Sequence, residues 1–98
     1  MIQREGDRAT VFAEGKIDTF KAAQFAEEIK TALPGTRELV LDCSGLIYIS
    51  SSGLRAVMLA VKTMNRQGSM RIVNMNEEIY DILEVTGFIG VCDVEMKE

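Results

Sequence analysis

Hydrophobic and polar residues follow two periodicities along this chain, one typical of helices and one typical of strands. Apolar residues at three- and four-residue spacing predict amphipathic helices over 20–33, from the serines at 50–52 to residue 68, and over 77–86. Short runs rich in β-branched and other apolar residues predict strands at 2–5, 8–14, 38–42, 70–73 and 91–95. The order is ββαβαβαβ, which indicates an α/β fold: a mixed β-sheet of four to five strands with helices packed against it.

Turn and capping residues mark where several of these elements begin. Gly6-Asp7 favours a two-residue turn that closes a hairpin between the first two strands. Asp18 or Thr19 can cap the first helix, and Asn76 can cap the third. No linker, repeat or low-complexity segment interrupts the pattern, so we expect one domain over residues 1–98.

The middle of the chain contains a short apolar strand and the connector that is expected to follow it. Glu38–Asp42 is a short apolar run suited to a strand buried on both faces, and residues 43–49 are expected to form a connector with its own apolar patch. The helical positions expected to face the core share a three- and four-residue spacing. They are Ala22, Phe25, Ala26, Ile29 and Leu33 in the first helix and Leu54, Val57, Met58, Val61 and Met64 in the second.

The composition of these 98 residues excludes several classes of function. The absence of histidine removes Ser-His and Cys-His catalytic pairs and every histidine-ligated metal site. Cys43 and Cys92 are too few for a zinc cluster and are expected to be free thiols of a cytoplasmic protein. We expect no catalysis, cofactor or metal. No stretch approaches the ~18 apolar residues of a membrane span, and no export signal precedes the first strand, so direct membrane insertion is not expected.

Charge is distributed unevenly along the chain. The net charge of −4 argues against a nucleic-acid partner, which would require a basic face. Residues 43–76 nevertheless carry four basic side chains and no acidic one, whereas residues 77–98 have a net charge of −6. This asymmetry either marks where a charged partner docks or arises by chance in a short chain. The middle segment is therefore the first place to look for function.

Three serines lie where the second helix is expected to begin: Ser50, Ser51 and Ser52, followed by Gly53. One interpretation is structural, because serine is a preferred helix N-cap. The other is phosphorylation, because the free N–H groups and dipole of a helix start accommodate a phosphate, whose charge then alters what a partner meets. Gly53 is compatible with both, since a missing side chain leaves room beside the hydroxyl.

The outer face of the same helix carries Arg55, Leu59, Lys62 and Arg66 at three- and four-residue spacing. A basic row with a leucine in its middle is typical of a helix that docks in a partner's groove. A merely solvated face is the alternative, because single exposed leucines are common. Phe20, opposite the apolar stripe of the first helix, is either an exposed contact or folded back against the helix start.

Together these residues resemble the STAS domain, the fold shared by bacterial anti-sigma factor antagonists and the cytosolic part of sulfate transporters. The resemblance rests on residues 39–54, which end in Ser50-Ser51-Ser52-Gly53-Leu54 where the antagonists have Asp-Ser-Ser-Gly-Leu. Gly15-Lys16-Ile17-Asp18 is similar to the Gly-x-Leu/Ile-Asp turn of the family, and the order of elements matches over the whole chain.

The resemblance implies partner switching controlled by phosphorylation. An unmodified antagonist binds an anti-sigma factor that is also a serine kinase. Phosphorylation of the first serine of Ser-Ser-Gly-Leu, here Ser51, releases that partner, and a serine phosphatase resets the switch. Asp18 matches an acidic position on the kinase-facing surface. With Ser50, Ser52, Gly53 and the outer face of the second helix, it forms the partner-binding surface that the resemblance implies.

One departure from the family pattern keeps alternatives open. Ser50 replaces an aspartate. This change either alters recognition by the kinase, moves the phosphorylation to Ser50, or prevents phosphorylation altogether. Ser52 is a further alternative site. The second hypothesis is therefore a non-phosphorylated STAS subunit of a transporter or membrane-associated complex. The third is a thiol enzyme that uses Cys43, for which the chain offers no histidine as a base.

Overall fold

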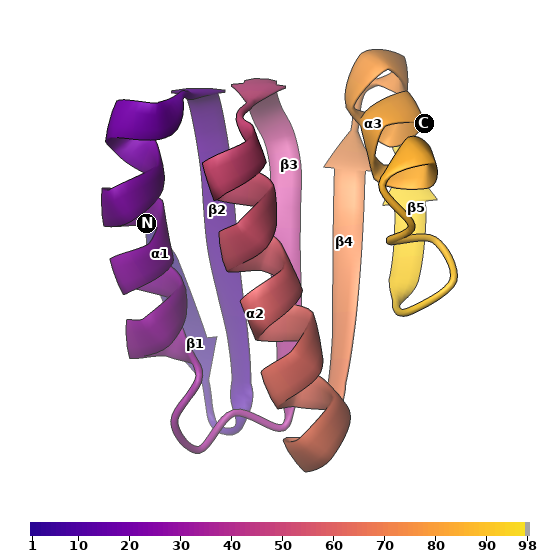
Figure 1. Ribbon diagram of the computed structural model, residues 1–98. Helices are drawn as coiled ribbons and strands as arrows, with labels where there is room; N and C mark the ends of the chain where they lie inside the picture. Colours follow the sequence, from indigo (N-terminus) through magenta and orange to yellow (C-terminus); the bar gives the residue numbers. More distant parts are fainter. Residues whose placement is uncertain (98) are drawn as a thin grey trace.

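A computed structural model describes residues 1–97 and contains the elements in the predicted order (Figure 1). The strands are β1 Ile2–Glu5, β2 Arg8–Ile17, β3 Glu38–Ile49, β4 Ser69–Met75 and β5 Asp93–Met96. The helices are α1 Thr19–Ala32, α2 Ser51–Gln67 and α3 Glu77–Val85. The strands form a sheet in the order β1-β2-β3-β4-β5, antiparallel between β1 and β2 and parallel elsewhere. The α/β class, the mixed sheet and the ββαβαβαβ order are confirmed.

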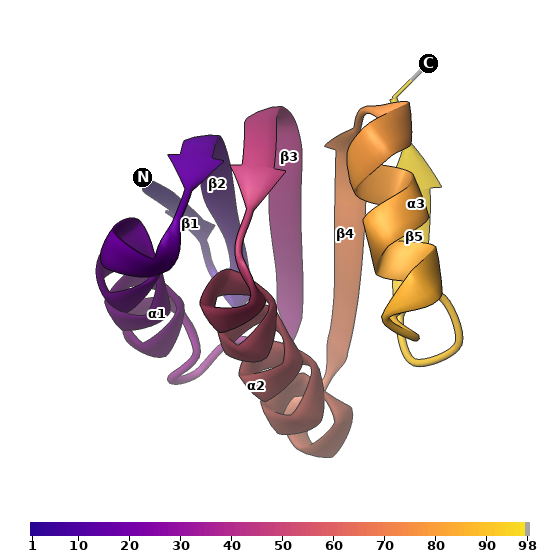
Figure 2. The ribbon, with the colours of Figure 1, turned by 45° about the horizontal axis from the view of Figure 1, so that its top comes forward.

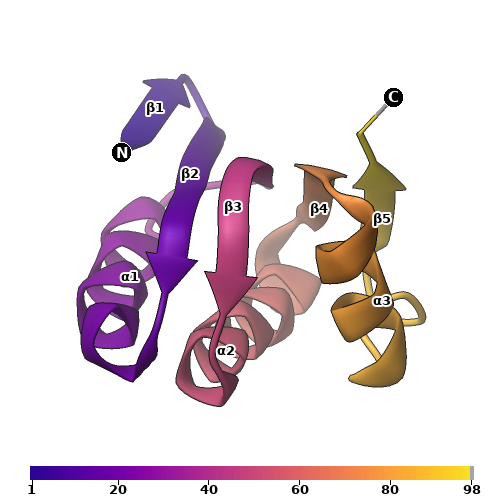
Figure 3. The same cartoon turned by 90° about the horizontal axis from the view of Figure 1, so that it is seen from above.

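The three helices cover the same face of the sheet, as the view from above shows (Figure 3). Each of them connects two neighbouring parallel strands, and crossovers of one hand place all such helices on one side. The core lies between the helices and this face of the sheet. Its strand residues alternate along β2 and β3, with Ala9, Val11 and Leu41 among the most deeply buried.

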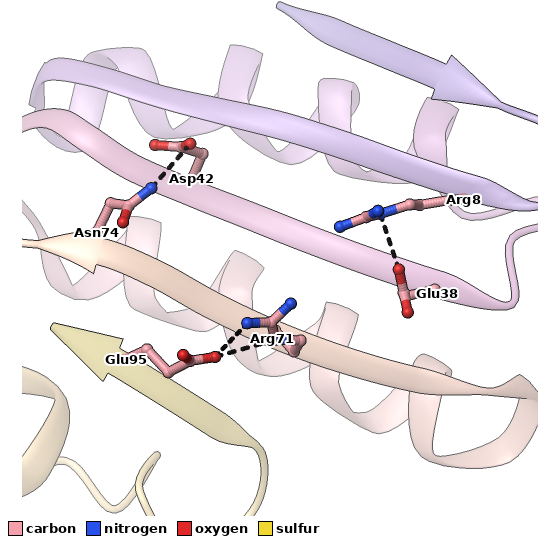
Figure 4. A network of polar contacts seen from close by, with 6 residues as sticks. All are labelled: Arg8, Glu38, Asp42, Arg71, Asn74 and Glu95. Atoms are coloured by element: carbon pink, nitrogen blue, oxygen red, sulfur yellow. Dashed lines mark hydrogen bonds and ion pairs between the residues drawn. The ribbon is translucent and has the colours of Figure 1, made fainter. Parts of the chain in front are cut away.

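The opposite face of the sheet has no helical cover and carries charged side chains that pair across strands (Figure 4). Arg8 Nε lies 2.8 Å from Glu38 Oε1, and Arg71 is hydrogen-bonded to Glu95 on β5. These exposed pairs contribute at most about 1 kcal/mol each to stability. Val40 lies among them with only 6% of its surface exposed. Residues on both faces of this strand are therefore buried, as predicted, although helices cover one face alone.

β3 is the element that differs most from the prediction. The expected connector at residues 43–49 continues the strand to Ile49, and β2 likewise continues beyond residue 14 to Ile17. Between Asp42 and Tyr48 the register with β2 shifts twice, and each shift adds one residue to β3. Such β-bulges interrupt the two-residue alternation, so this segment lacks the sequence pattern of a strand. The carboxylate of Asp42 holds the first bulge by accepting the N–H of Ser44 at 2.9 Å.

The face of α2 that packs inward is rotated slightly from the predicted stripe. Its buried positions are Gly53, Ala56, Val57, Ala60, Val61 and Met64. Leu54 and Met58, which were expected to face the core, are half-buried. The rotation accompanies the packing of α1 beside α2: the small Ala56 lines the groove between the two helices, and Ala60 is fully buried.

Side chains from two elements distant in the sequence hold the turn between α1 and β3 in place through hydrogen bonds. Gln67 Nε2, at the end of α2, donates hydrogen bonds to the carbonyl oxygens of Leu33 at 2.7 Å and Thr36 at 2.8 Å. Arg4 Nη1, on β1, donates to Thr36 Oγ1 at 2.9 Å, and its Nη2 donates to the carbonyl of Pro34 at 2.8 Å. The end of α1 and the turn that follows it are thereby held by donors from β1 and from the end of α2.

Gln67→Glu is expected to lower the free energy of unfolding by about 1–3 kcal/mol, because a carboxylate has no N–H to satisfy these two partly buried carbonyls. Urea denaturation measures the change. The matched control is Gln24→Glu on the exposed side of α1, which we expect to change stability by less than about 0.5 kcal/mol. An unchanged midpoint for Gln67→Glu would contradict this fastening role.

Candidate functional site

The first turn of α2 lies at the sheet edge where β2 and β3 end. The Ser50 N–H, directly after β3, donates to the carbonyl of Ile17, the last residue of β2, at 2.8 Å. Because the strands are parallel, the residues that follow them lie at the same edge. Asp18 there precedes α1, and Ser51 begins α2. Figure 2 shows β2 leading into α1 and β3 leading into α2 at this edge. The carboxyl edge of an α/β sheet is where such folds commonly bind ligands.

Ser50 is the N-cap of α2 and is buried. Its backbone is extended, its Oγ accepts the Gly53 N–H at 3.2 Å, and 5% of its surface is exposed. The capping interpretation is therefore confirmed for this serine. A phosphate on Ser50 would have to enter the interior, which is costly for a charged group. The geometry thus argues against Ser50 as the modified residue.

Ser51 and Ser52 differ in how open their hydroxyls are. Ser51 is exposed, and its hydroxyl makes no hydrogen bond to any residue from 1 to 97. Ser52 is half-buried and lines a shallow groove between α1 and α2. Ser51 lines a second groove, between α2 and the segment after α3, beside Met58 and Phe88. Of the three serines, Ser51 is the one most accessible to an approaching enzyme.

Gly53 lets the first turn of α2 sit directly on the ends of the strands. A Cβ at this position would lie 2.7 Å from Ile49 Cγ1 and 3.1 Å from Ile17 Cγ2. The space is therefore needed against these two side chains, and not beside the serine hydroxyl as expected from the sequence. Because Gly53 is buried, it allows the close packing under the first turn of α2 and is not itself exposed to a partner.

Asp18 is the N-cap of α1, which decides between the two capping candidates. Its Oδ1 accepts the N–H of Lys21 at 2.8 Å, and Thr19 is the first residue of the helix. The carboxylate remains exposed at the same sheet edge as Ser51. Phe20, next along α1, is 89% exposed, so it is not folded back against the helix start.

The outer face of α2 is an exposed basic row formed by Arg55, Lys62 and Arg66, with Leu59 between them. None of the three cations forms an ion pair among residues 1–97, and α2 contains no acidic residue. Leu59 is 43% exposed in the middle of this basic row. The predicted outer stripe is thus exposed, and no ion pair within the described part of the chain compensates its charge.

A family model described as the STAS domain matches residues 1–98. The chain belongs to the STAS domain family.

Several known proteins are similar to this STAS domain. BtrV of Bordetella bronchiseptica is 31% identical over 83 residues, which cover 83% of this chain and 72% of that protein. The anti-sigma-B factor antagonist of Listeria monocytogenes is 24% identical over 99 residues, covering 98% of this chain and 86% of that protein. The structure of the Bacillus cell fate determinant SpoIIAA in the phosphorylated form has a TM-score of 0.76 and 14% identity, covering 96% and 88% of the two chains. This last likeness is one of fold.

Two exposed apolar residues of the STAS domain were not expected at this edge. Ile47 is 61% exposed and Tyr48 is 48% exposed near the end of β3, where the sequence predicted an apolar connector. They are adjacent and both exposed because the second β-bulge falls between Leu46 and Tyr48. Periodicity could not reveal them. Exposed aromatic residues such as Tyr48 and Phe20 are frequent anchors of protein interfaces.

The cysteines of the STAS domain are poor nucleophiles. Cys43 is 2% exposed, and burial raises the pKa of its thiol to about 12. Cys92 is half-buried, and burial raises its pKa to about 11. Because the thiolate is the reactive form, both residues are largely unreactive near neutral pH.

Among residues 1–97, no helix is long and apolar enough to cross a membrane.

We expect a thiol reagent at about pH 8 to label Cys92 slowly and Cys43 only after unfolding. With its pKa raised from 9.0 to about 12, the thiolate fraction of Cys43 falls by roughly a thousandfold at this pH. Intact mass measured with and without denaturant checks the result, and a Cys92→Ala variant isolates Cys43. The same shift makes stability constant below pH 9.0 and lets it fall as the pH rises toward about 12. Fast labelling of native Cys43 would revive thiol chemistry.

Proposed function

We propose that this STAS domain is an anti-sigma factor antagonist whose complex with an anti-sigma factor is released by phosphorylation of Ser51. The observation that carries the proposal is the open Ser51 hydroxyl at the sheet edge, beside a basic row that forms no ion pair with residues 1–97. The similarity to an anti-sigma-B factor antagonist supports the role, and the fold shared with phosphorylated SpoIIAA supports the modification. The role is binding, without catalysis or cofactor, and we place it in the cytoplasm.

In the unmodified state, the basic row and the exposed Leu59 would meet an acidic and partly apolar face of the partner. Asp18 and Ser52 would complete this surface at its sheet-edge end. Because like charges and desolvation cost several kcal/mol at an interface, an added dianion on Ser51 would disfavour the complex. The surface works through charge, and no change of fold is required.

The partner would be both anti-sigma factor and serine kinase. In the transfer step, the Ser51 hydroxyl would give its proton to a base of the kinase, its oxygen would bond to the γ-phosphorus of ATP, and the bond between that phosphorus and ADP would break, so that ADP leaves. A serine phosphatase would reset the switch by transferring the phosphoryl group to water. The buried Ser50 hydroxyl stays in the helix cap throughout, which keeps the docking helix in place.

Incubation with ATP and the cognate anti-sigma kinase, followed by intact mass and peptide mapping, tests this function. We expect one phosphate, located on Ser51. Ser51→Ala should abolish its addition, whereas Ser44→Ala, at an exposed serine of β3, should retain it and serves as the matched control. A protein that gains no phosphate from its anti-sigma partner would overturn the switch.

A second candidate function is a non-phosphorylated STAS subunit of a transporter or membrane-associated complex. It is favoured by Ser50, which replaces the acidic residue of the antagonist pattern next to the modified serine. Co-purification from the native host separates the two roles. A kinase-like anti-sigma factor supports the first function, and a transport ATPase supports the second.

A further inference from the structure

We propose that Arg55 binds the phosphate placed on Ser51, so that phosphorylation also withdraws a cation from the docking surface. This inference rests on the function proposed above for Ser51. It assigns a separate role to one member of the basic row, which would act as a partner contact in one state and as an internal phosphate ligand in the other.

The position of Arg55 on α2 carries the inference. Arg55 lies four residues after Ser51, and side chains at this spacing are neighbours on one helix face, about 6 Å apart along the axis. Both residues line the groove between α2 and the segment after α3. The other residues that line this groove are uncharged: Leu54, Met58, Thr86 and Phe88. Among residues 1–97, no carboxylate lines the groove and competes with a phosphate for Arg55.

Arg55 is also free to change partners. It lies on the crest of α2 and lines the α1–α2 groove as well, beside Ser52 and Leu59. Its guanidinium forms no ion pair within the described chain, residues 1–97. A guanidinium matches a phosphate with two parallel hydrogen bonds, a geometry that lysine lacks. Lys62 lies seven residues beyond Arg55, about 10 Å further along the helix axis from Ser51, and is too distant to bind the phosphate in place of Arg55.

Two consequences distinguish this arrangement from simple repulsion. In the unmodified protein, Arg55 is available to an acidic partner. After phosphorylation, the phosphate on Ser51 competes with that partner for Arg55. The basic row then offers one positive charge fewer, and the surface gains the negative charge of the phosphate. Substitution of Arg55 should therefore weaken the unmodified complex and also reduce the difference in affinity between the two states.

The test uses the full chain with phosphoserine installed at position 51 by genetic encoding, which needs no kinase. Titration followed by ³¹P NMR measures the second pKa of the phosphate, ordinarily about 6. We expect Arg55→Gln to raise this pKa by roughly 0.2–0.4 unit. The matched control, Lys62→Gln, removes the same charge further along the helix and should shift it by about 0.1 unit or less.

The outcomes separate this inference from the function on which it rests. Equal pKa values in the parent phosphoprotein and in Arg55→Gln would overturn the phosphate contact, even if the kinase modifies Ser51. A kinase that never modifies Ser51 would overturn the function, while the NMR titration would still decide whether Arg55 binds the phosphate. Circular dichroism of Arg55→Gln should be unchanged, because the residue is exposed.

Discussion

Ser51→Asp is expected to weaken binding to the anti-sigma partner by about a hundredfold or more. The substituted carboxylate would enter a desolvated interface without a cation from the partner, and an uncompensated buried charge costs about 3–5 kcal/mol. The melting temperature should stay within a few degrees of the parent protein. Ser51 is exposed, and an acidic residue in the first turn of a helix is favourable to the helix dipole.

Two control variants make this result specific. Ser51→Ala removes the hydroxyl without adding charge and should bind the partner as the parent does. Asn65→Asp adds the same charge on an exposed position of α2, about 21 Å along the helix from residue 51. Isothermal titration calorimetry measures all three affinities. If Ser51→Asp binds as tightly as Ser51→Ala, charge at this residue does not control the complex.

Local chemistry explains why the sequence predicted this region well. Serine, aspartate and asparagine cap helices through contacts within three residues, and the structure places caps at Asp18, Ser50 and Asn76. Helical spacing likewise depends on residues close in the chain. It correctly assigned Arg55 and Leu59 to the outer face of α2.

What the sequence did not predict depends on pairing between distant segments. The two bulges of β3 arise from its register with β2, and they place Ile47 and Tyr48 side by side on the surface. The exposure of Ser51 and the burial of Ser50 likewise follow from how α2 meets the ends of β2 and β3. From the sequence, residue 68 was expected only to end the second helix. In the structure it is also a point of close backbone approach.

Gly68→Ala is expected to cause a large loss of stability, about 3 kcal/mol or more. A Cβ at this position would lie 1.9 Å from the carbonyl oxygen of Arg37 and 2.6 Å from its carbonyl carbon. These are backbone atoms, which cannot rotate away as a side chain would. The same carbonyl accepts the Ser69 N–H at 2.9 Å, and the Gly68 N–H donates to Met64 at 2.7 Å. Relieving the clash would therefore disturb the end of α2 and the start of β4 together.

Two other glycines separate this steric effect from backbone strain. Gly87 has a φ of +86° but nothing within 4 Å of an added Cβ, so Gly87→Ala should cost about 1–2 kcal/mol. Gly90 has neither a close neighbour nor a positive φ, so Gly90→Ala should be nearly neutral. Urea denaturation of the three variants is expected to rank Gly68→Ala as by far the least stable. If Gly68→Ala is instead as stable as Gly90→Ala, the backbone at residues 37 and 68 can move apart freely. The close approach of these two residues then does not fix the position of α2.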